Sequence, residues 1–120
     1  MDTSALIDSL TGHRRSLSRM TELINSGEPL IVPTVVLYEW LRGPRLPQEL
    51  DACEELFPQD QIVVFGLAEA RVASRLYREV RHPRGREIDL AIAATAITRD
   101  AALWTLNHDD FRDIAHLTLI

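Results

Sequence analysis

Short apolar runs that alternate with longer helical stretches constrain this chain more than any other feature. The runs cover residues 30–32, 62–65, 102–105 and 117–120. Each has the length of a buried strand, whereas the stretches between them carry apolar residues at the three- and four-residue spacing of helices. Strands separated by helices predict an α/β fold with a parallel sheet covered by helices on both faces.

Helix boundaries can be assigned from capping and breaking residues. Thr3 or Ser4 is expected near the cap of the first helix, and the breakers Asn25-Ser26-Gly27 and Gly43-Pro44 end the second and third. No repeat, low-complexity tract or long linker divides the 120 residues, so one domain is expected. The predicted helices cover residues 3–10, 17–25, 34–42, 47–57, 67–80 and 87–98.

Charge and composition exclude some classes of protein. The net charge of −5 argues against binding nucleic acid through a broad basic face, although all 13 basic residues are arginine, which binds phosphate bidentately. The single cysteine, Cys53, cannot form a disulfide within the chain. We find neither an uncharged run of membrane-spanning length nor a signal-peptide pattern, and therefore expect a cytoplasmic protein without a membrane partner.

Acidic residues occur in four contexts that suggest a shared site. Asp2 opens the chain, Glu39 lies in an apolar helix turn, Asp89 starts an alanine-rich helix, and Asp109 and Asp110 follow a strand. Each has a structural alternative: a helix cap for Asp2, a solvated position for Glu39, a favourable first-turn charge for Asp89, and a turn for Asp109-Asp110. Parallel sheets bind ligands beyond the carboxyl ends of their strands, which favours a functional interpretation of the set.

These segments, in this order and spacing, resemble the motifs of the PIN-domain family, especially its VapC-type toxins. The opening Asp-Thr-Ser-Ala-Leu-Ile resembles the first motif of the family, and Tyr-Glu followed by Arg-Gly the second. Asp-Leu-Ala-Ile-Ala-Ala resembles the third, and Thr-x-Asn-x-x-Asp-Phe one form of the last. The matching segments are residues 2–7, 38–43, 89–94 and 105–111.

The resemblance implies a single PIN domain over residues 1–120, folded as a three-layer α/β/α sandwich with a mostly parallel central sheet. It implies that Asp2, Glu39, Asp89 and Asp110 converge at the carboxyl end of that sheet. Crowded carboxylates repel one another unless cations are bound, and all-oxygen ligands favour Mg²⁺ or Mn²⁺. We expect Asp2 and Asp89 to bind metal directly, and Glu39 and Asp110 to bind it directly or through water.

Other polar residues are weaker candidates. Ser4 and Thr105 could orient carboxylates by hydrogen bonding. Asn107 stands where many relatives carry an aspartate, so one site charge could be missing. Asp109 replaces Asp110 if the loop shifts by one residue, and we favour Asp110. We expect His108 in the solvated loop, whereas Arg84 and Arg86 lie beside Asp89 in the sequence and could contact phosphate.

The function implied by the resemblance is metal-dependent hydrolysis of RNA phosphodiester bonds by the toxin of a toxin–antitoxin pair. Its implied partners are RNA, a cognate antitoxin with a basic segment, and a second copy of the chain in a homodimer. The alternative is a catalytically inactive PIN-like module that only binds a partner. A phosphatase on a related sheet is a third hypothesis, weakened because Ser4 occupies the position of its second acid.

The start of the chain departs from the family pattern. In relatives an apolar strand precedes the first aspartate and lies in the middle of the sheet, whereas here only Met1 precedes Asp2. Loss of a central strand would leave backbone groups of both neighbouring strands unpaired. We therefore expect a truncated first strand, with the native start upstream of Met1, and a loosely placed Asp2 if it is absent.

Overall fold

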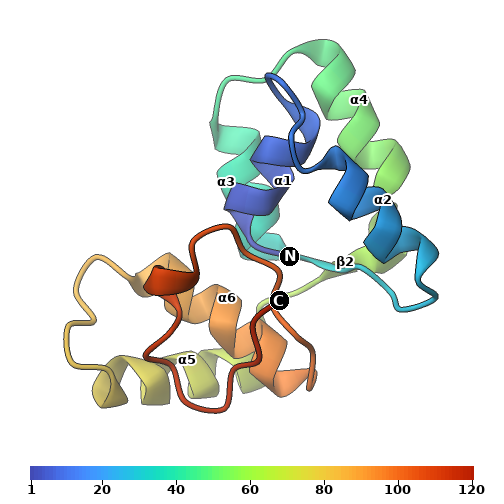
Figure 1. Ribbon diagram of the computed structural model, residues 1–120. Coiled ribbons are helices and arrows are strands. Elements are labelled where there is room, and N and C mark those ends of the chain that lie inside the picture. The colour runs from blue at the N-terminus through green and yellow to red at the C-terminus, as the bar shows by residue number, and fades with distance from the viewer.

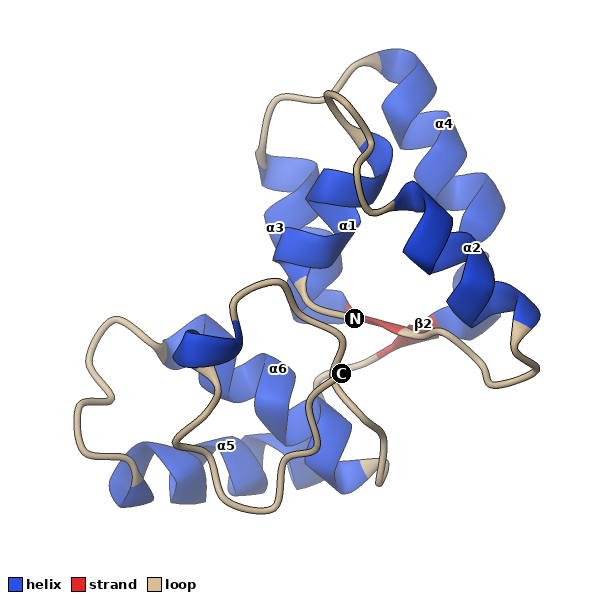
Figure 2. Ribbon diagram, in the orientation of Figure 1, coloured by secondary structure: helices blue, strands red, loops and turns tan.

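Helices on two sides of a short central sheet make up the structure, a computed structural model that describes residues 1–120. Helices α1 to α4 lie on one side of the strands, and α5 and α6 with the C-terminal segment on the other (Figures 1 and 2). No helix has both the length and the apolar character needed to cross a membrane. The elements are α1 (Thr3–Leu10), α2 (Leu17–Asn25), β1 (Val32–Pro33), α3 (Thr34–Arg42), α4 (Pro47–Leu56), the 3₁₀ helix η1 (Gln59–Gln61), β2 (Ile62–Val63), α5 (Leu67–Glu79), α6 (Glu87–Thr98) and the 3₁₀ helix η2 (His108–Asp110).

The predicted helices are confirmed with almost the expected bounds, because each carries its own breakers. α5 ends at Glu79 and α4 at Leu56, each one residue earlier than expected. The first cap differs from the prediction. Asp2, and not Thr3 or Ser4, is the N-cap of α1, and its side chain accepts a hydrogen bond from the Thr3 N–H.

The sheet is parallel, as predicted, but much smaller than the apolar runs suggest. β1 pairs with β2 in parallel, with Val32 opposite Ile62. Of the last two predicted strands, only the parallel bridge between Leu103 and Leu119 forms. A strand needs a neighbour for its backbone hydrogen bonds, so apolar character alone does not decide how far it extends.

α6 forms the centre of the core. Its residues from Leu90 to Ala96 are all buried, and the helix packs mainly against α5 and also against α3. A helix that is apolar all round is expected to be buried on every face. Trp40 and Val36 of α3 and Leu6 of α1 complete the core with side chains that are inaccessible to solvent.

Met1 and Asp2 lie between the two strand pairs. The Met1 amine donates to the Ile31 carbonyl at 3.2 Å, and the Asp2 N–H donates to the Trp104 carbonyl at 2.8 Å. These two residues occupy part of the position of a central strand. Their backbone hydrogen bonds to both sides fix the position of Asp2. The expectation that Asp2 would be loosely placed is therefore wrong for this structure.

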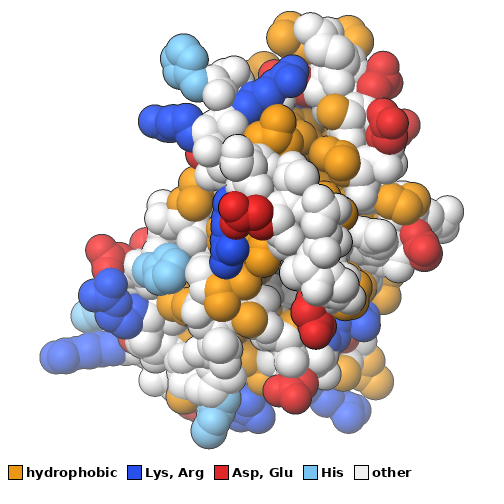
Figure 3. All heavy atoms as spheres, turned by 45° about the vertical axis from the view of Figure 1, so that its right-hand side comes forward, with side chains coloured by type: hydrophobic (Ala, Val, Ile, Leu, Met, Phe, Trp, Pro, Cys, Tyr) orange, Lys and Arg blue, Asp and Glu red, His pale blue; other side chains and the backbone are white.

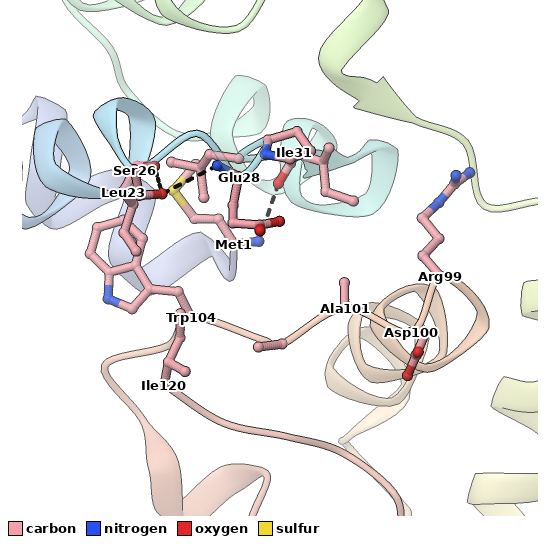
Figure 4. A pocket seen from close by; sticks show the side chains of 13 residues that line it. Met1, Leu23, Ser26, Glu28, Ile31, Arg99, Asp100, Ala101, Trp104 and Ile120 are labelled. Carbon is pink, nitrogen blue, oxygen red and sulfur yellow. Dashed lines mark hydrogen bonds between the residues drawn. The ribbon is translucent and has the colours of Figure 1, made fainter.

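A cavity of about 570 Å³ adjoins Met1 (Figure 4). Its walls are formed mainly by residues 28–31 and 99–102 together with Trp104, and most of them are apolar. Neither the N–H nor the C=O of Ala102 has a backbone hydrogen-bond partner. Burial lowers the pKa of the Met1 amine to about 6, against a nearby Asp2 charge that raises it.

We predict that four apolar, β-branched residues added before Met1 stabilise the domain. They would fill the cavity, pair with Ala102 and replace the buried amine by a peptide group. Thermal unfolding should shift upward by several degrees, since about 1 kcal/mol moves the midpoint of a domain of this size by about 4 °C.

A Gly-Ser extension of equal length is the control and should give a smaller shift. In the unextended chain the lowered amine pKa makes stability fall as pH falls from 8 to 6, because the unfolded chain binds the proton more tightly. Both extensions should remove this contribution. Equal melting temperatures for all three proteins would contradict the prediction.

Candidate active site

The Asp2 carboxylate is buried and surrounded by hydrogen-bond donors. One oxygen, Oδ1, accepts from the Thr3 N–H at 2.7 Å. The other, Oδ2, accepts from Ser4 Oγ at 2.9 Å and from Thr105 Oγ1 at 2.7 Å. Asp2 is therefore both a helix cap and a fixed acid, so its structural and functional interpretations are compatible. Ser4 and Thr105 contact it as the sequence suggested.

Glu39 is directed from α3 toward the start of α1. Thr3 Oγ1 donates to Glu39 Oε1 at 2.6 Å, and Arg42 pairs with Oε2 at 3.2 Å. The Glu39 side chain is 20% exposed. Glu39 is thus only partly exposed, whereas its structural alternative was a solvated position on an amphipathic helix.

Asp89 lies in the first turn of α6 and is affected by the three other acids. Its pKa is raised to about 6, first by burial and then by the negative charges of Asp2, Asp110 and Glu39. Arg86 acts in the opposite direction. The fold thus brings together acids that are up to 108 positions apart in the sequence, so that their charges interact.

The geometry favours Asp110 over Asp109. The Asp109 side chain is 86% exposed and pairs with Arg112 at 2.6 Å. Asp110, the next residue of η2, is the one whose charge raises the pKa of Asp89. The preference for Asp110 stays a prediction, which its charge effect on Asp89 supports.

Arg86 holds the loop that carries Asp110. Its Nη1 and Nη2 donate to the two carboxylate oxygens of Asp113 at 2.8 and 2.7 Å, and Nη2 also donates to the Asp110 carbonyl at 2.9 Å. These hydrogen bonds lower the pKa of Asp113. The Arg86 guanidinium therefore binds groups of the chain itself, whereas the sequence suggested that it could contact phosphate. Sequence reasoning missed Asp113, because nothing in the sequence pairs it with a residue 27 positions away.

The remaining candidates lie at the edge of the acid cluster. The Asn107 N–H donates to Thr105 Oγ1 at 2.9 Å, while its side chain is exposed and forms no hydrogen bond within the chain. His108 Nε2 lies 3.2 Å from the Ile120 carbonyl and is exposed, in agreement with its assignment to the solvated loop. Arg84 is also exposed and takes part in no ion pair.

The donor set fits a hard divalent cation. All four clustered side chains are carboxylates, and their mutual repulsion at Asp89 is what a bound cation would relieve. In this structure, however, no three His, Cys, Asp or Glu side chains are placed so that they could hold a metal ion together. Cys53 is buried in α4, where burial raises its pKa to about 11, and so offers no reactive thiolate.

We predict that Asp89→Asn stabilises the metal-free protein at pH 7.5. Because the folded-state pKa is raised from 3.8 to about 6, the ionised carboxylate is unfavourable in the fold above pH 6. This penalty disappears as pH falls through 6 toward 4, so the gain in melting temperature measured in EDTA should shrink at pH 4.5. Asp109→Asn, at the exposed neighbour, should change little. A lower melting temperature for Asp89→Asn at pH 7.5 would contradict the prediction.

We predict that Arg86 and Asp113 stabilise the domain as one unit. Arg86→Ala and Asp113→Asn should each lower the free energy of unfolding by roughly 1–2 kcal/mol, since charged hydrogen bonds are lost at a partly exposed site. The double variant should be little worse than either single one. Urea unfolding measures this, with Arg112→Ala as the control because its partner Asp109 is exposed. Additive losses would indicate independent roles.

Comparison with known proteins gives consistent matches over the whole chain. The family profile described as PIN domain matches residues 1–117. Ribonuclease VapC19 of Mycobacterium tuberculosis, from strains CDC 1551 / Oshkosh and ATCC 25618 / H37Rv, is 38% identical over 112 residues, which are 89% of this chain and 86% of the relative.

A solved structure gives independent support for the fold. It is described as the crystal structure of VapBC2 from Rickettsia felis bound to a DNA fragment from their promoter, and it superimposes with a TM-score of 0.77. The match covers 99% of this chain and 94% of the other, at 21% sequence identity. The family profile, the identity to VapC19 and this shared fold agree with the ordered acidic motifs, and the chain therefore belongs to the PIN-domain family.

Proposed function

We propose that the chain is a metal-dependent endoribonuclease that hydrolyses RNA phosphodiester bonds and acts in the cytoplasm as the toxin of a toxin–antitoxin pair. The observation that carries the proposal is the gathering of Asp2, Glu39 and Asp110 around the partly buried Asp89, whose pKa is raised first by burial and then by their charges. The 38% identity to Ribonuclease VapC19 supports RNA as the substrate.

In this proposal Mg²⁺ or Mn²⁺ is held by Asp2 and Asp89, with Glu39 and Asp110 binding it directly or through water. When bound there, such a cation would lower the pKa of a water molecule and offset the negative charge of the leaving oxygen. Ser4 and Thr105 fix the orientation of the Asp2 carboxylate, and Thr3 fixes that of Glu39. Arg86 positions the Asp110 backbone.

The surface charge explains why cations would also be needed to bind the substrate. Figure 3 shows acidic, basic, hydrophobic and uncharged side chains interspersed on one face, without a continuous basic surface there. Clustered carboxylates repel the phosphates of RNA, and bound cations would reverse the local charge.

The proposed antitoxin covers the acid cluster. Tyr38 and Leu41, exposed by 56% and 58%, lie on the same helix as Glu39 and offer apolar contacts beside it. A partner with apolar residues and a basic side chain directed at the carboxylates would complement this surface. A homodimer is also part of the proposal, and Leu67 and Tyr77 of α5 are exposed apolar residues available for it.

The test is cleavage of a structured RNA pool with Mg²⁺, with Mn²⁺ and with EDTA. Cutting should require the metal and fall at least about a hundredfold in Asp89→Asn, because a direct ligand is lost. Asp109→Asn is the matched control and should cut like the wild type, since its side chain is 86% exposed and paired with Arg112.

Two outcomes would overturn the proposal. A folded, metal-loaded wild type that cuts no RNA would support the inactive partner-binding module. Hydrolysis of phosphate monoesters without cleavage of RNA would support the phosphatase hypothesis. Circular dichroism of each sample separates loss of function from loss of fold.

A further inference from the structure

A second, polar cavity adjoins the acid cluster. It has a volume of about 400 Å³ and lies between α1, the loop after it and the loop after Thr105. Ser4 lines this cavity and also donates to Asp2 Oδ2, so one side chain separates the two sites. The lining residues are Ser4, Ile7, Asp8, Thr11, Gly12, His13, Arg15, Leu106 and Asn107.

Hydrogen-bond donors are available at one rim of this cavity. The Asp8 carboxylate is already satisfied, because Ser16 Oγ donates to it at 2.6 Å and Arg15 at 3.2 Å. Arg15 uses Nε and Nη2 in this pair and remains 79% exposed, so Nη1 is free. His13 is exposed, and the adjacent Arg14 takes part in no ion pair. This rim thus offers the free edge of the Arg15 guanidinium and the His13 ring, while Asp8 in the same lining balances the Arg15 charge.

The opposite rim presents an apolar side chain beside a free amide. The Leu106 N–H donates to Ser4 Oγ at 3.2 Å, and the Asn107 N–H donates to Thr105 Oγ1 at 2.9 Å. Their backbones are thereby anchored to the two hydroxyls that hold Asp2. The Leu106 side chain remains 46% exposed, and the Asn107 amide forms no hydrogen bond within the chain.

We propose that this cavity binds the nucleotide of single-stranded RNA that flanks the phosphate held at the acid cluster. His13 and Arg15 contact the flanking phosphate, Leu106 packs against the base, and the Asn107 amide bonds to its edge. A splayed base offers both an apolar face and a hydrogen-bonding edge, and the volume is that of an ordinary ligand pocket. The inference rests on the proposed ribonuclease function.

The first test measures binding without cleavage. In an Asp89→Asn background, fluorescence anisotropy with a labelled single-stranded RNA should show about tenfold weaker binding for Arg15→Ala and for Asn107→Ala, since one good polar contact is worth about that factor. Arg78→Ala on α5 is the matched control, because Arg78 is exposed, forms no ion pair and does not line the cavity. It should bind within about twofold of the parent.

The second test uses the active chain. Arg15→Ala should raise KM and leave kcat nearly unchanged, since it removes binding that is equal in the ground and transition states, and Asn107→Ala should raise KM as well. RNA with 4-thiouridine beside the cleavage position should crosslink to residues 4–15 or 106–107. Circular dichroism and melting temperature confirm that each variant is folded.

The outcomes distinguish this inference from the proposed function. If the wild type cuts RNA, but both variants behave like Arg78→Ala and crosslinks fall elsewhere, the inference is overturned and the ribonuclease stands. If the wild type neither cuts nor binds RNA, the ribonuclease proposal fails and the inference fails with it.

Discussion

The hydrogen bonds of Asp2 hold this structure together at the point where its parts meet. Its N–H binds the Trp104 carbonyl, its carboxylate caps α1, and the hydroxyls of Ser4 and Thr105 close around the same side chain. One residue thus connects the start of the chain, the first helix and the C-terminal segment. A buried carboxylate is stable only when hydrogen-bond donors surround it. The donors that allow Asp2 to be buried therefore also fix the orientation of its side chain.

The position of Asp2 also places its negative charge close to Asp89, where ionisation of the carboxyl group is unfavourable. Asp89 is partly buried in the first turn of α6, and its pKa is raised first by this burial and then by the charges of the three other acids. Arg86 lies beside Asp89 but pairs with Asp113, and Arg42 pairs with Glu39 from the exposed side. The repulsion between the acids is therefore balanced by ion pairs only at the edges of the cluster, where Arg42 and Arg86 bind their partners.

The helices were predictable and the strands were not. A helix such as 87–98 satisfies its backbone within itself, so periodicity and breakers fix its bounds. A strand depends on a neighbour, and the run 102–105 forms only one bridge, between Leu103 and Leu119, and accepts one hydrogen bond from the Asp2 N–H at Trp104. The preference for Asp110 over Asp109 followed the motif, whereas the pairing of Arg86 with Asp113 had no local signal.

The sequence by itself determined the α/β alternation and the parallel direction of the sheet, since these depend on local periodicity, and its resemblance to a family selected the four acids as candidates. Only the tertiary structure decided the size of the sheet, the engagement of Arg86, and the polar cavity between His13 and Asn107. Each of these requires groups far apart in the chain to meet, and their meeting depends on packing and on the backbone partners available, which no local pattern encodes.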